Sequence, residues 1–152
     1  MTCPEIIYTS NVSETEAVGA SLAKRILSDP SLPPFVALYG DLGVGKTAFV
    51  RGFASVIAPA ALVRSPTFAL VNEYRGKEQQ LFHFDMYRIE SEDDLDSIGF
   101  YDYLDRRGIC LVEWSERIPY ALPDDLLRVT IEKDDARHAD HRRITLERIT
   151  EA

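Results

Sequence analysis

Hydrophobic and polar residues follow one another along the chain in patterns that predict a mixed sheet with helices between its first strands. Apolar residues recur at helical spacing over residues 14–28, and Ser13 with Glu16 forms a capping-box pattern at the start of this predicted helix. Residues 35–39 are continuously apolar and of strand length, as expected for a strand buried on both faces. A glycine-rich loop follows, and then a predicted helix over residues 46–57.

The second half of the chain carries most of the predicted strands. We expect them, in chain order, over residues 69–74, 81–87, 109–112, 126–131 and 144–146. Between the second and third of these, Ser91 and the acidic residues after it mark a helix N-terminus, because negative side chains suit the positive end of the helix dipole. The last two strands pair as a hairpin. Strands separated by helices early in the chain, followed by strands alone, predict a mixed α/β sheet.

The composition indicates the number of domains and disfavours some classes of binding partner. The chain has 152 residues, of which 45% are hydrophobic, and this predicts one folded domain over residues 1–152. It carries 17 Lys and Arg against 25 Asp and Glu, a formal charge of −8, which disfavours direct binding to nucleic acid or to an anionic membrane. Two cysteines, no leader pattern and no membrane-spanning run predict a cytoplasmic location.

One motif points directly to chemistry. Residues 40–47 read G-D-L-G-V-G-K-T and satisfy the G-x-x-x-x-G-K-[ST] pattern in full, with a buried strand before them and a helix after them. Backbone N–H groups of such a loop surround phosphate oxygens, Lys46 reaches the β- and γ-phosphates, and the Thr47 hydroxyl binds Mg²⁺. We therefore predict a nucleotide site with the contact residues Gly43, Val44, Gly45, Lys46, Thr47 and Ala48.

A phosphate-binding loop needs a carboxylate to hold its metal, and two positions compete for that role. Glu113 follows the apolar run of residues 109–112, the usual form of a Walker-B strand, and Asp85 ends the apolar run of residues 81–84. The alternative for both is a structural carboxylate that pairs with arginine or caps a loop. Metal or water chemistry is favoured, because the loop requires Mg²⁺ nearby.

Four further residues have a structural interpretation beside the functional one. His83 taken alone is more often a hydrogen-bonded sheet histidine than a ligand. Trp114, the only tryptophan, is explained equally well by packing or by a role at the nucleotide site. Ser65 and Thr67 flank a proline, in a turn that either bonds locally or senses the γ-phosphate. The residues alone favour the local turn.

Taken in order, these motifs resemble the TsaE family, also called YjeE, of bacterial P-loop ATPases in the biosynthesis of tRNA threonylcarbamoyladenosine (t6A). The motifs that carry the resemblance are the loop of residues 40–47, Ser65-Pro66-Thr67-Phe68, His83-x-Asp85-x-Tyr87-Arg88 and Glu113-Trp114. The resemblance runs from residue 13 to about residue 146. It implies a three-layer, P-loop NTPase-like α/β fold, whose mixed sheet has a parallel core and antiparallel C-terminal strands.

The resemblance also implies a function. A TsaE-like subunit uses ATP and Mg²⁺ in a complex with TsaD-like and TsaB-like proteins, and its ATP hydrolysis resets the complex between turnovers. The TsaD-like partner transfers the threonylcarbamoyl group, so tRNA concerns this chain only through its partners. The site roles that the resemblance implies are catalysis by Lys46, Asp85 and Glu113, metal binding by Thr47 and Glu113, and further functional positions at Ser65, Thr67, His83 and Trp114.

This chain departs from the pattern of the family at one position. Many members have a second hydroxyl residue where this chain has Ala48, and that hydroxyl can touch the α-phosphate.

Two other functions are alternatives to the one that the resemblance implies. A small-molecule kinase would use the same loop, although the span from Arg88 to Gly108 leaves little room for a lid. A nucleotide-controlled binding module would bind without hydrolysis and would use residues 65–68 as its switch.

A basic cluster near the C-terminus stands apart from these motifs. It consists of Arg137, His138, His141, Arg142 and Arg143. We interpret it as the solvated part of the predicted hairpin, and the alternative is a surface that faces a tRNA-bearing partner.

Overall fold

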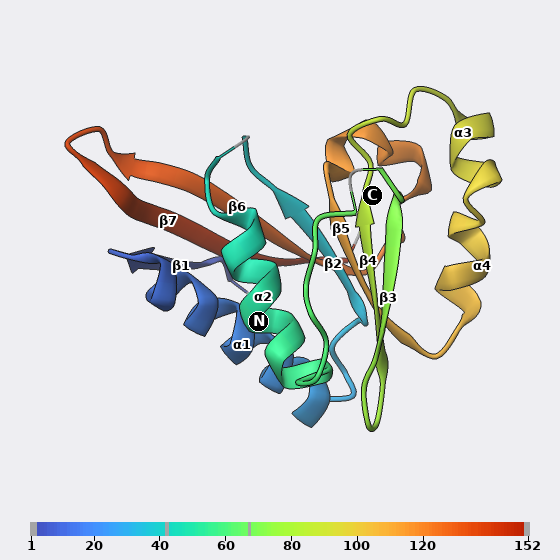
Figure 1. Ribbon diagram of the computed structural model, residues 1–152, viewed down its shortest axis with the longest axis horizontal. Coiled ribbons are helices and arrows are strands. Elements are labelled where there is room, and N and C mark those ends of the chain that lie inside the picture. The colour runs from blue at the N-terminus through green and yellow to red at the C-terminus, as the bar shows by residue number, and fades with distance from the viewer. Residues whose placement is uncertain (1–2, 42, 67, 151–152) are drawn as a thin grey trace.

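A seven-stranded mixed sheet runs through the protein (Figure 1). The computed structural model describes residues 3–41, 43–66 and 68–150, so the predicted sensor Thr67 lies outside the described residues. The strands are β1 Glu5–Thr9, β2 Phe35–Tyr39, β3 Val71–Arg75, β4 Gln80–Asp85, β5 Gly108–Glu113, β6 Leu126–Asp135 and β7 His138–Ile149. The helices are α1 Val12–Ser28, α2 Lys46–Ile57, α3 Glu92–Ser97 and α4 Phe100–Asp105, with the 3-10 helices η1 Ser115–Arg117 and η2 Pro119–Ala121. Within the described part of the chain, no helix has the length and apolar character to cross a membrane.

The strand order, β1-β7-β6-β2-β5-β4-β3, confirms the fold class predicted from the sequence. Strands β6, β2, β5 and β4 pair in parallel and form the centre of the sheet. Strands β1, β7 and β3 pair antiparallel with their neighbours. Because β2, β5 and β4 run in one direction, their carboxyl ends meet at one edge of the sheet, where ligands bind in open α/β folds.

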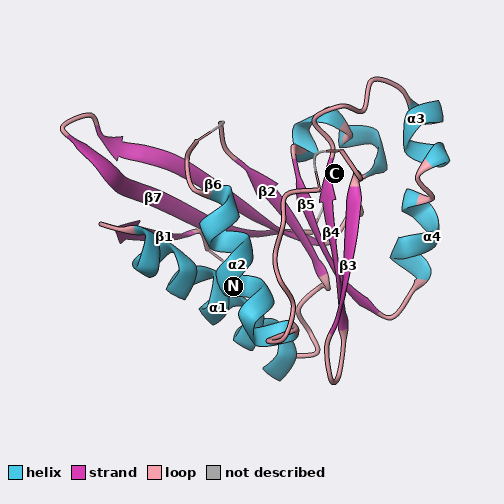
Figure 2. Cartoon of the chain, in the orientation of Figure 1, coloured by secondary structure: helices cyan, strands magenta, loops and turns pink. Residues whose placement is uncertain are grey.

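Helices cover the sheet from both sides, which gives three layers (Figure 2). On one face, α1 and α2 bury Leu22, Phe49 and Phe53 against the central strands. On the other face, Phe100 of α4 meets Phe84 of β4 edge to face, with ring centroids 5.2 Å apart. Figure 2 shows α3 and α4 beside the β3–β4 end of the sheet, far from the outer end of the β6–β7 hairpin.

Two glycines let α1 and α2 pack backbone against backbone. A Cβ added at Gly52 would lie 1.8 Å from the carbonyl oxygen of Glu16, and one at Gly19 would lie 2.2 Å from that of Phe49. Neither backbone can move aside without separating the helices. The predicted phosphate-binding loop leads directly into α2, so this contact also positions the helix that follows the loop.

We therefore expect Gly52→Ala to be strongly destabilising. The added methyl group forces the helices apart, and overpacking of this kind costs about 1–3 kcal/mol or more. Urea unfolding followed by circular dichroism would show a large fall in the midpoint. Ser21→Ala, an exposed change on α1, is the matched control and should leave the midpoint unchanged. An unchanged midpoint for Gly52→Ala would contradict the close contact.

The start of α1 differs from the prediction. The helix begins at Val12, and its N-cap is Asn11, whose side chain accepts a hydrogen bond from the Glu14 backbone N–H at 2.9 Å. The Glu14 carboxylate in turn accepts from the Ser10 N–H at 2.7 Å. The predicted capping box at Ser13 is therefore wrong, because asparagine caps helices as well as serine does and stands two residues earlier.

Other elements also differ from the prediction. Strand β1 was not predicted, and it pairs with β7 at the end of the strand order. The acidic helix after Ser91 is two short helices, because Gly99 between them adopts a left-handed conformation with φ 72°. Strands β6 and β7 extend well beyond their predicted apolar cores. Their outer ends are polar, and polar residues carry no burial pattern from which a strand could be predicted.

The two cysteines differ sharply in environment, and this gives a simple test of the fold. Cys110 is buried in β5, and burial raises the pKa of its thiol to about 12, whereas Cys3 is exposed. Because the thiolate is the reactive form, we expect one fast equivalent with a disulfide reagent at pH 8 and the second only in denaturant. Cys3→Ser should remove the fast equivalent. Two fast equivalents in the native protein would contradict the buried position of β5.

Candidate functional site

The predicted phosphate-binding loop lies where β2 ends and α2 begins. Gly40, Gly43 and Gly45 have φ values of 152°, 79° and 102°. Gly43 and Gly45 occupy left-handed conformations that other residues rarely adopt, and Gly45 is the N-cap residue of α2. Gly40 also needs its missing side chain, because a Cβ there would lie 2.8 Å from the Ile131 carbonyl oxygen. The glycines therefore allow the curl of the loop, which other residues would strain.

A cleft of about 370 Å³ opens beside this loop at the carboxyl ends of β4 and β5. Eight predicted residues line it: Gly43, Gly45, Lys46, Thr47, Ser65, Asp85, Glu113 and Trp114. Two others, Val44 and Ala48, face a separate small hollow on the other side of Gly45. A larger hollow of about 650 Å³ lies between the ends of α1 and α2 and the β3–β4 turn, and none of the predicted residues lines it. Most of the predicted site residues therefore lie around the cleft of about 370 Å³ and not around the larger hollow.

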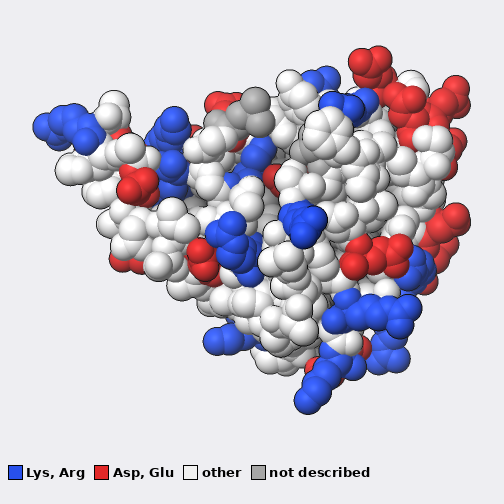
Figure 3. Space-filling view, in the orientation of Figure 1, with Lys and Arg blue, Asp and Glu red and all other residues white. Residues whose placement is uncertain are grey.

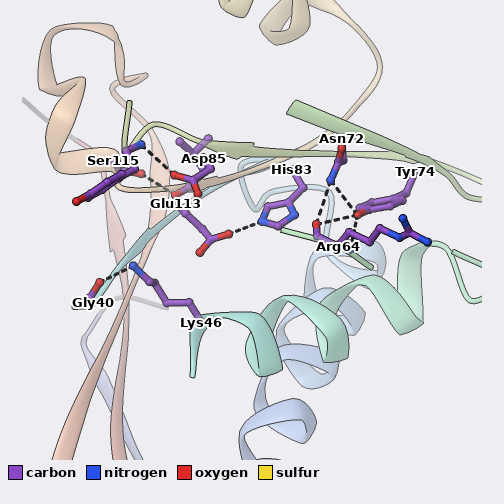
Figure 4. A network of polar contacts seen from close by, with 11 residues as sticks. Gly40, Lys46, Arg64, Asn72, Tyr74, His83, Asp85, Glu113 and Ser115 are labelled. Atoms are coloured by element: carbon purple, nitrogen blue, oxygen red, sulfur yellow. Dashed lines mark hydrogen bonds and ion pairs between the residues drawn. The ribbon is translucent and has the colours of Figure 1, made fainter. Parts of the chain in front are cut away.

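Lys46 is buried in the cleft and held by two weak partners, of which Figure 4 shows the Gly40 carbonyl group. Its Nζ donates a hydrogen bond to the Gly40 carbonyl oxygen at 2.6 Å and lies 4.2 Å from the centroid of the Trp114 ring. Trp114 adopts a left-handed conformation with φ 58°, which is unusual for a bulky residue. A carbonyl and an aromatic ring bind an ammonium group more weakly than phosphate oxygens do, so Lys46 can exchange partners when phosphate enters.

Glu113, at the end of β5, bonds to His83 of β4. The His83 Nε2 lies 2.6 Å from the Glu113 Oε2, and the two side chains are 2% and 10% exposed. Since a carboxylate accepts hydrogen bonds, Nε2 carries the proton, and the buried Nδ1 has no hydrogen-bond partner within the described structure. His83 is thus a sheet histidine that orients Glu113.

Asp85 lies directly beside Glu113 in the sheet. The two residues are register partners across β4 and β5, and both are buried. One Asp85 oxygen accepts a hydrogen bond from the Tyr87 backbone N–H at 2.9 Å. Two neighbouring carboxylates repel each other, so this end of the cleft favours cations. No group of three or more His, Cys, Asp or Glu side chains among residues 3–41, 43–66 and 68–150 is arranged to hold a metal ion.

The segment that carries Ser65 is anchored to β3. The Arg64 carbonyl oxygen accepts from the Asn72 side-chain amide at 3.0 Å, and the Arg64 N–H donates to the Tyr74 hydroxyl oxygen at 3.0 Å (Figure 4). Ser65 then lines the cleft. Phe68 is 83% exposed, with the Arg88 guanidinium 4.5 Å from its ring centroid. The anchored backbone brings Ser65 to the cleft wall, and its role as a sensor stays a prediction.

Arg142 is the residue at this site that sequence reasoning missed. The basic cluster was interpreted as solvated, but Arg142 is partly buried, and its Nε donates to the Val44 carbonyl oxygen at 2.6 Å. Its Nη2 lies 3.4 Å from the Gly43 carbonyl oxygen. The interpretation is therefore wrong for Arg142. It failed because the contact spans 98 positions and depends on how β7 pairs in the sheet.

Charge is distributed unevenly over the surface. Figure 3 shows acidic side chains gathered over α3 and α4, while basic side chains lie at the outer end of the β6–β7 hairpin. The acidic group belongs to the first turns of these helices: Glu92, Asp93, Asp94 and Asp102. The net charge of −8 therefore does not describe the hairpin, which lies next to the phosphate-binding loop through Arg142.

The family model and two similar proteins carry the same family name. The model of the family described as "Threonylcarbamoyl adenosine biosynthesis protein TsaE" matches residues 9–144. A tRNA threonylcarbamoyladenosine biosynthesis protein TsaE from Bacillus subtilis is 37% identical over 131 residues, covering 85% of this chain and 79% of the relative. Its namesake from Haemophilus influenzae is 42% identical over 106 residues, covering 69% of this chain and 67% of the relative. The crystal structure of Bacillus subtilis YdiB matches with a TM-score of 0.74 at 31% identity, covering 99% of this chain and 88% of that chain.

Proposed function

This chain belongs to the TsaE family of threonylcarbamoyl adenosine biosynthesis proteins, and we propose that it is the ATP-binding and ATP-hydrolysing subunit of that biosynthesis. In this proposal residues 1–152 act as a single P-loop ATPase domain in the cytoplasm. Hydrolysis resets or activates TsaD-like and TsaB-like partners, which alone handle the tRNA. The observation that carries the proposal is the cleft in which a phosphate-binding loop and Lys46 face two adjacent buried carboxylates.

Binding of ATP begins with an exchange of partners at Lys46. The backbone N–H groups of the loop surround the β-phosphate, and Lys46 leaves the Gly40 carbonyl oxygen for the β- and γ-phosphate oxygens. A charge-assisted bond to phosphate replaces a bond to a neutral carbonyl, so the exchange is favourable. The partly positive N-terminus of α2, which begins at Lys46, adds to the attraction.

Mg²⁺ fits the oxygen groups at this end of the cleft. Thr47 offers a hydroxyl and Glu113 a carboxylate in the same cleft, and Mg²⁺ bound to a nucleotide uses one or two such protein ligands together with phosphate oxygens and water. When bound, the ion neutralises charge that develops on the phosphates. His83 keeps the Glu113 carboxylate turned in a fixed direction. Asp85, on the next strand, accepts a hydrogen bond from the attacking water and so orients it.

The test is phosphate release by the purified protein, alone and with the TsaD-like and TsaB-like partners. Hydrolysis that rises only when the partners are present supports the proposal. Transfer of phosphate to a small acceptor would instead identify a kinase, and binding without turnover in every mixture would identify a nucleotide-controlled binding module. Depletion of the protein in cells should remove t6A from tRNA, and unchanged t6A would contradict the assigned biosynthesis.

A further inference from the structure

We propose that strand β1 pairs with β1 of a second copy of this chain, so that the two sheets continue into each other across a twofold axis. In the described part of the sheet, β1 stands at the end of the strand order and has β7 as its neighbour. Figure 1 shows β1 on the side of β7 away from β6. A strand in that position has N–H and C=O groups that point away from the sheet and can pair with another strand.

The two edge strands of the sheet are protected to different degrees. Side chains of α4 reach the other edge strand, β3, where Arg106 and the Tyr103 hydroxyl donate to the Glu73 carboxylate at 2.9 and 2.8 Å. Charged groups of this kind discourage pairing at natural sheet edges. Strand β1 reads E-I-I-Y-T, with one charged residue at its first position and neither lysine nor proline. Its edge is therefore open to pairing.

Two large apolar side chains of β1 are exposed on one face of the sheet. Ile6 is 55% exposed and Tyr8 is 62% exposed. Ile7, between them, packs against the core that α1 shares with the sheet. Because successive side chains of a strand point to opposite faces, Ile6 and Tyr8 lie on the face away from α1. A partner strand beside β1 would remove part of this apolar surface from water.

The sequence of β1 matches itself when two copies run antiparallel. With Ile7 on the twofold axis, Ile6 of each copy lies opposite Tyr8 of the other. A β-branched residue opposite an aromatic residue is a favourable cross-strand pair, and the axis makes this pair twice. If the register shifted by two residues, one of the two exposed apolar residues in each copy would lose its apolar partner. The pattern therefore favours one register.

The proposed axis also relates the two copies of α1. Arg25 donates to the Glu5 carboxylate at 2.8 Å, and the Thr15 Oγ1 lies 2.9 Å from the Thr9 Oγ1. Helix α1 therefore runs antiparallel to β1, and Ile7 lies beside its middle. A twofold axis perpendicular to the sheet keeps each face on the same side. The two α1 helices then lie next to each other, antiparallel, on one face of the extended sheet.

Charged residues on α1 fit this arrangement. Arg25 lies on the side of α1 that faces β1, since it reaches Glu5. Glu14 lies on the same side, because it precedes Arg25 by about three helical turns. Glu14 of each copy therefore lies towards Arg25 of the other. This charge complementarity identifies a second copy, and not an unrelated strand, as the partner that fits.

Pairing through β1 leaves the phosphate-binding cleft accessible. Strands β7 and β6 separate β1 from β2, which leads into the loop of residues 40–47. The cleft itself lies beside that loop, at the carboxyl ends of β4 and β5. Association and nucleotide binding are thus independent properties, and a variant that loses one should keep the other.

Analytical ultracentrifugation of the full chain tests the association. We expect the mean mass to rise from 17.2 kDa towards twice that value as the protein concentration rises from about 1 µM to about 1 mM. Tyr8→Lys places a charge on the edge and should raise the dissociation constant of the dimer at least about tenfold. Leu62→Lys, at a position 72% exposed between α2 and β3, is the matched control and should leave that constant unchanged. Both variants should keep the circular dichroism spectrum of the wild type.

Cross-linking tests the register. In a Cys3→Ser background the remaining native thiol, that of Cys110, is buried. Mixing Ile6→Cys with Tyr8→Cys should give a disulfide between the two variants, because directly opposite residues have Cα atoms about 4.5–5.5 Å apart. Each variant alone should cross-link far more slowly, because two residues along a strand add about 7 Å and put the paired positions beyond the reach of a disulfide.

Three results would overturn the proposal. The first is a mass of 17.2 kDa at every concentration, which would leave β1 without a second copy. The second is a dimer that Tyr8→Lys does not weaken, because it would form through another surface. The third is equal cross-linking in the mixture and in the single variants, which would contradict the register about Ile7.

Discussion

Replacing Lys46 with alanine is expected to weaken ATP binding by about 10- to 100-fold, because the phosphates lose charge-assisted bonds worth about 1.5–3 kcal/mol. The effect on hydrolysis should be larger. In the proposed function Lys46 faces the β- and γ-phosphates, where charge shifts during bond cleavage, and the loss of one such electrostatic contact lowers turnover by about 10²- to 10³-fold. Equilibrium binding of labelled ATP and partner-stimulated phosphate release measure the two effects separately.

The fluorescence of Trp114 should report the movement of Lys46 in the same experiment. It is the only tryptophan, and the Lys46 ammonium lies 4.2 Å from its ring centroid. When phosphate draws Lys46 away, the emission of Trp114 should change in the wild type and stay constant in Lys46→Ala. Lys77→Ala, at an exposed position in the β3–β4 turn, is the matched control and should keep both affinity and signal. Normal ATP binding by Lys46→Ala would contradict the assignment of the phosphate site.

The sequence predicted the features of the molecule that depend on neighbouring residues. The loop of residues 40–47 was found because its glycines, Lys46 and Thr47 form one local pattern between a buried strand and a helix. The strand of residues 35–39 and the helix of residues 46–57 have the bounds that were predicted, since burial on both faces leaves a plain apolar run and the loop marks the helix start. The mixed sheet followed from the order of these elements.

Features that depend on distant residues could not be predicted in this way. The contact of Arg142 with Val44 requires β7 to lie between β1 and β6, and no local pattern encodes that order. The bond between His83 and Glu113 depends on the register of β4 against β5. The close approach at Gly52 depends on how α1 crosses α2. Each arises from tertiary packing, in which a single residue has a role only through its partner.

The second large effect is expected from the separate roles that we propose for the buried carboxylates of Glu113 and Asp85. We expect Glu113→Gln to raise the Mg²⁺ concentration needed for half-maximal ATP hydrolysis by at least about tenfold, because a neutral amide binds a hard cation much more weakly than a carboxylate. Asp85→Asn should leave that concentration within about threefold of the wild type. Its turnover at saturating Mg²⁺ should instead fall by about 10²-fold or more, since the attacking water loses the group that we propose orients it. Both changes preserve side-chain size, and both residues lie in one strand pair.

A Mg²⁺ titration of partner-stimulated phosphate release, run on both variants, distinguishes the two roles in one experiment. Glu78→Gln, an exposed change in the β3–β4 turn, is the control for loss of a carboxylate and should match the wild type. The reverse order, with the stronger Mg²⁺ effect at Asp85, would exchange the two roles and leave the cleft itself intact. Identical responses of the two variants would mean that the carboxylates act as one unit, and would contradict separate assignments. The bond of His83 to Glu113 at 2.6 Å supports the proposed metal-binding role of Glu113, because the carboxylates that bind metals are themselves hydrogen-bonded.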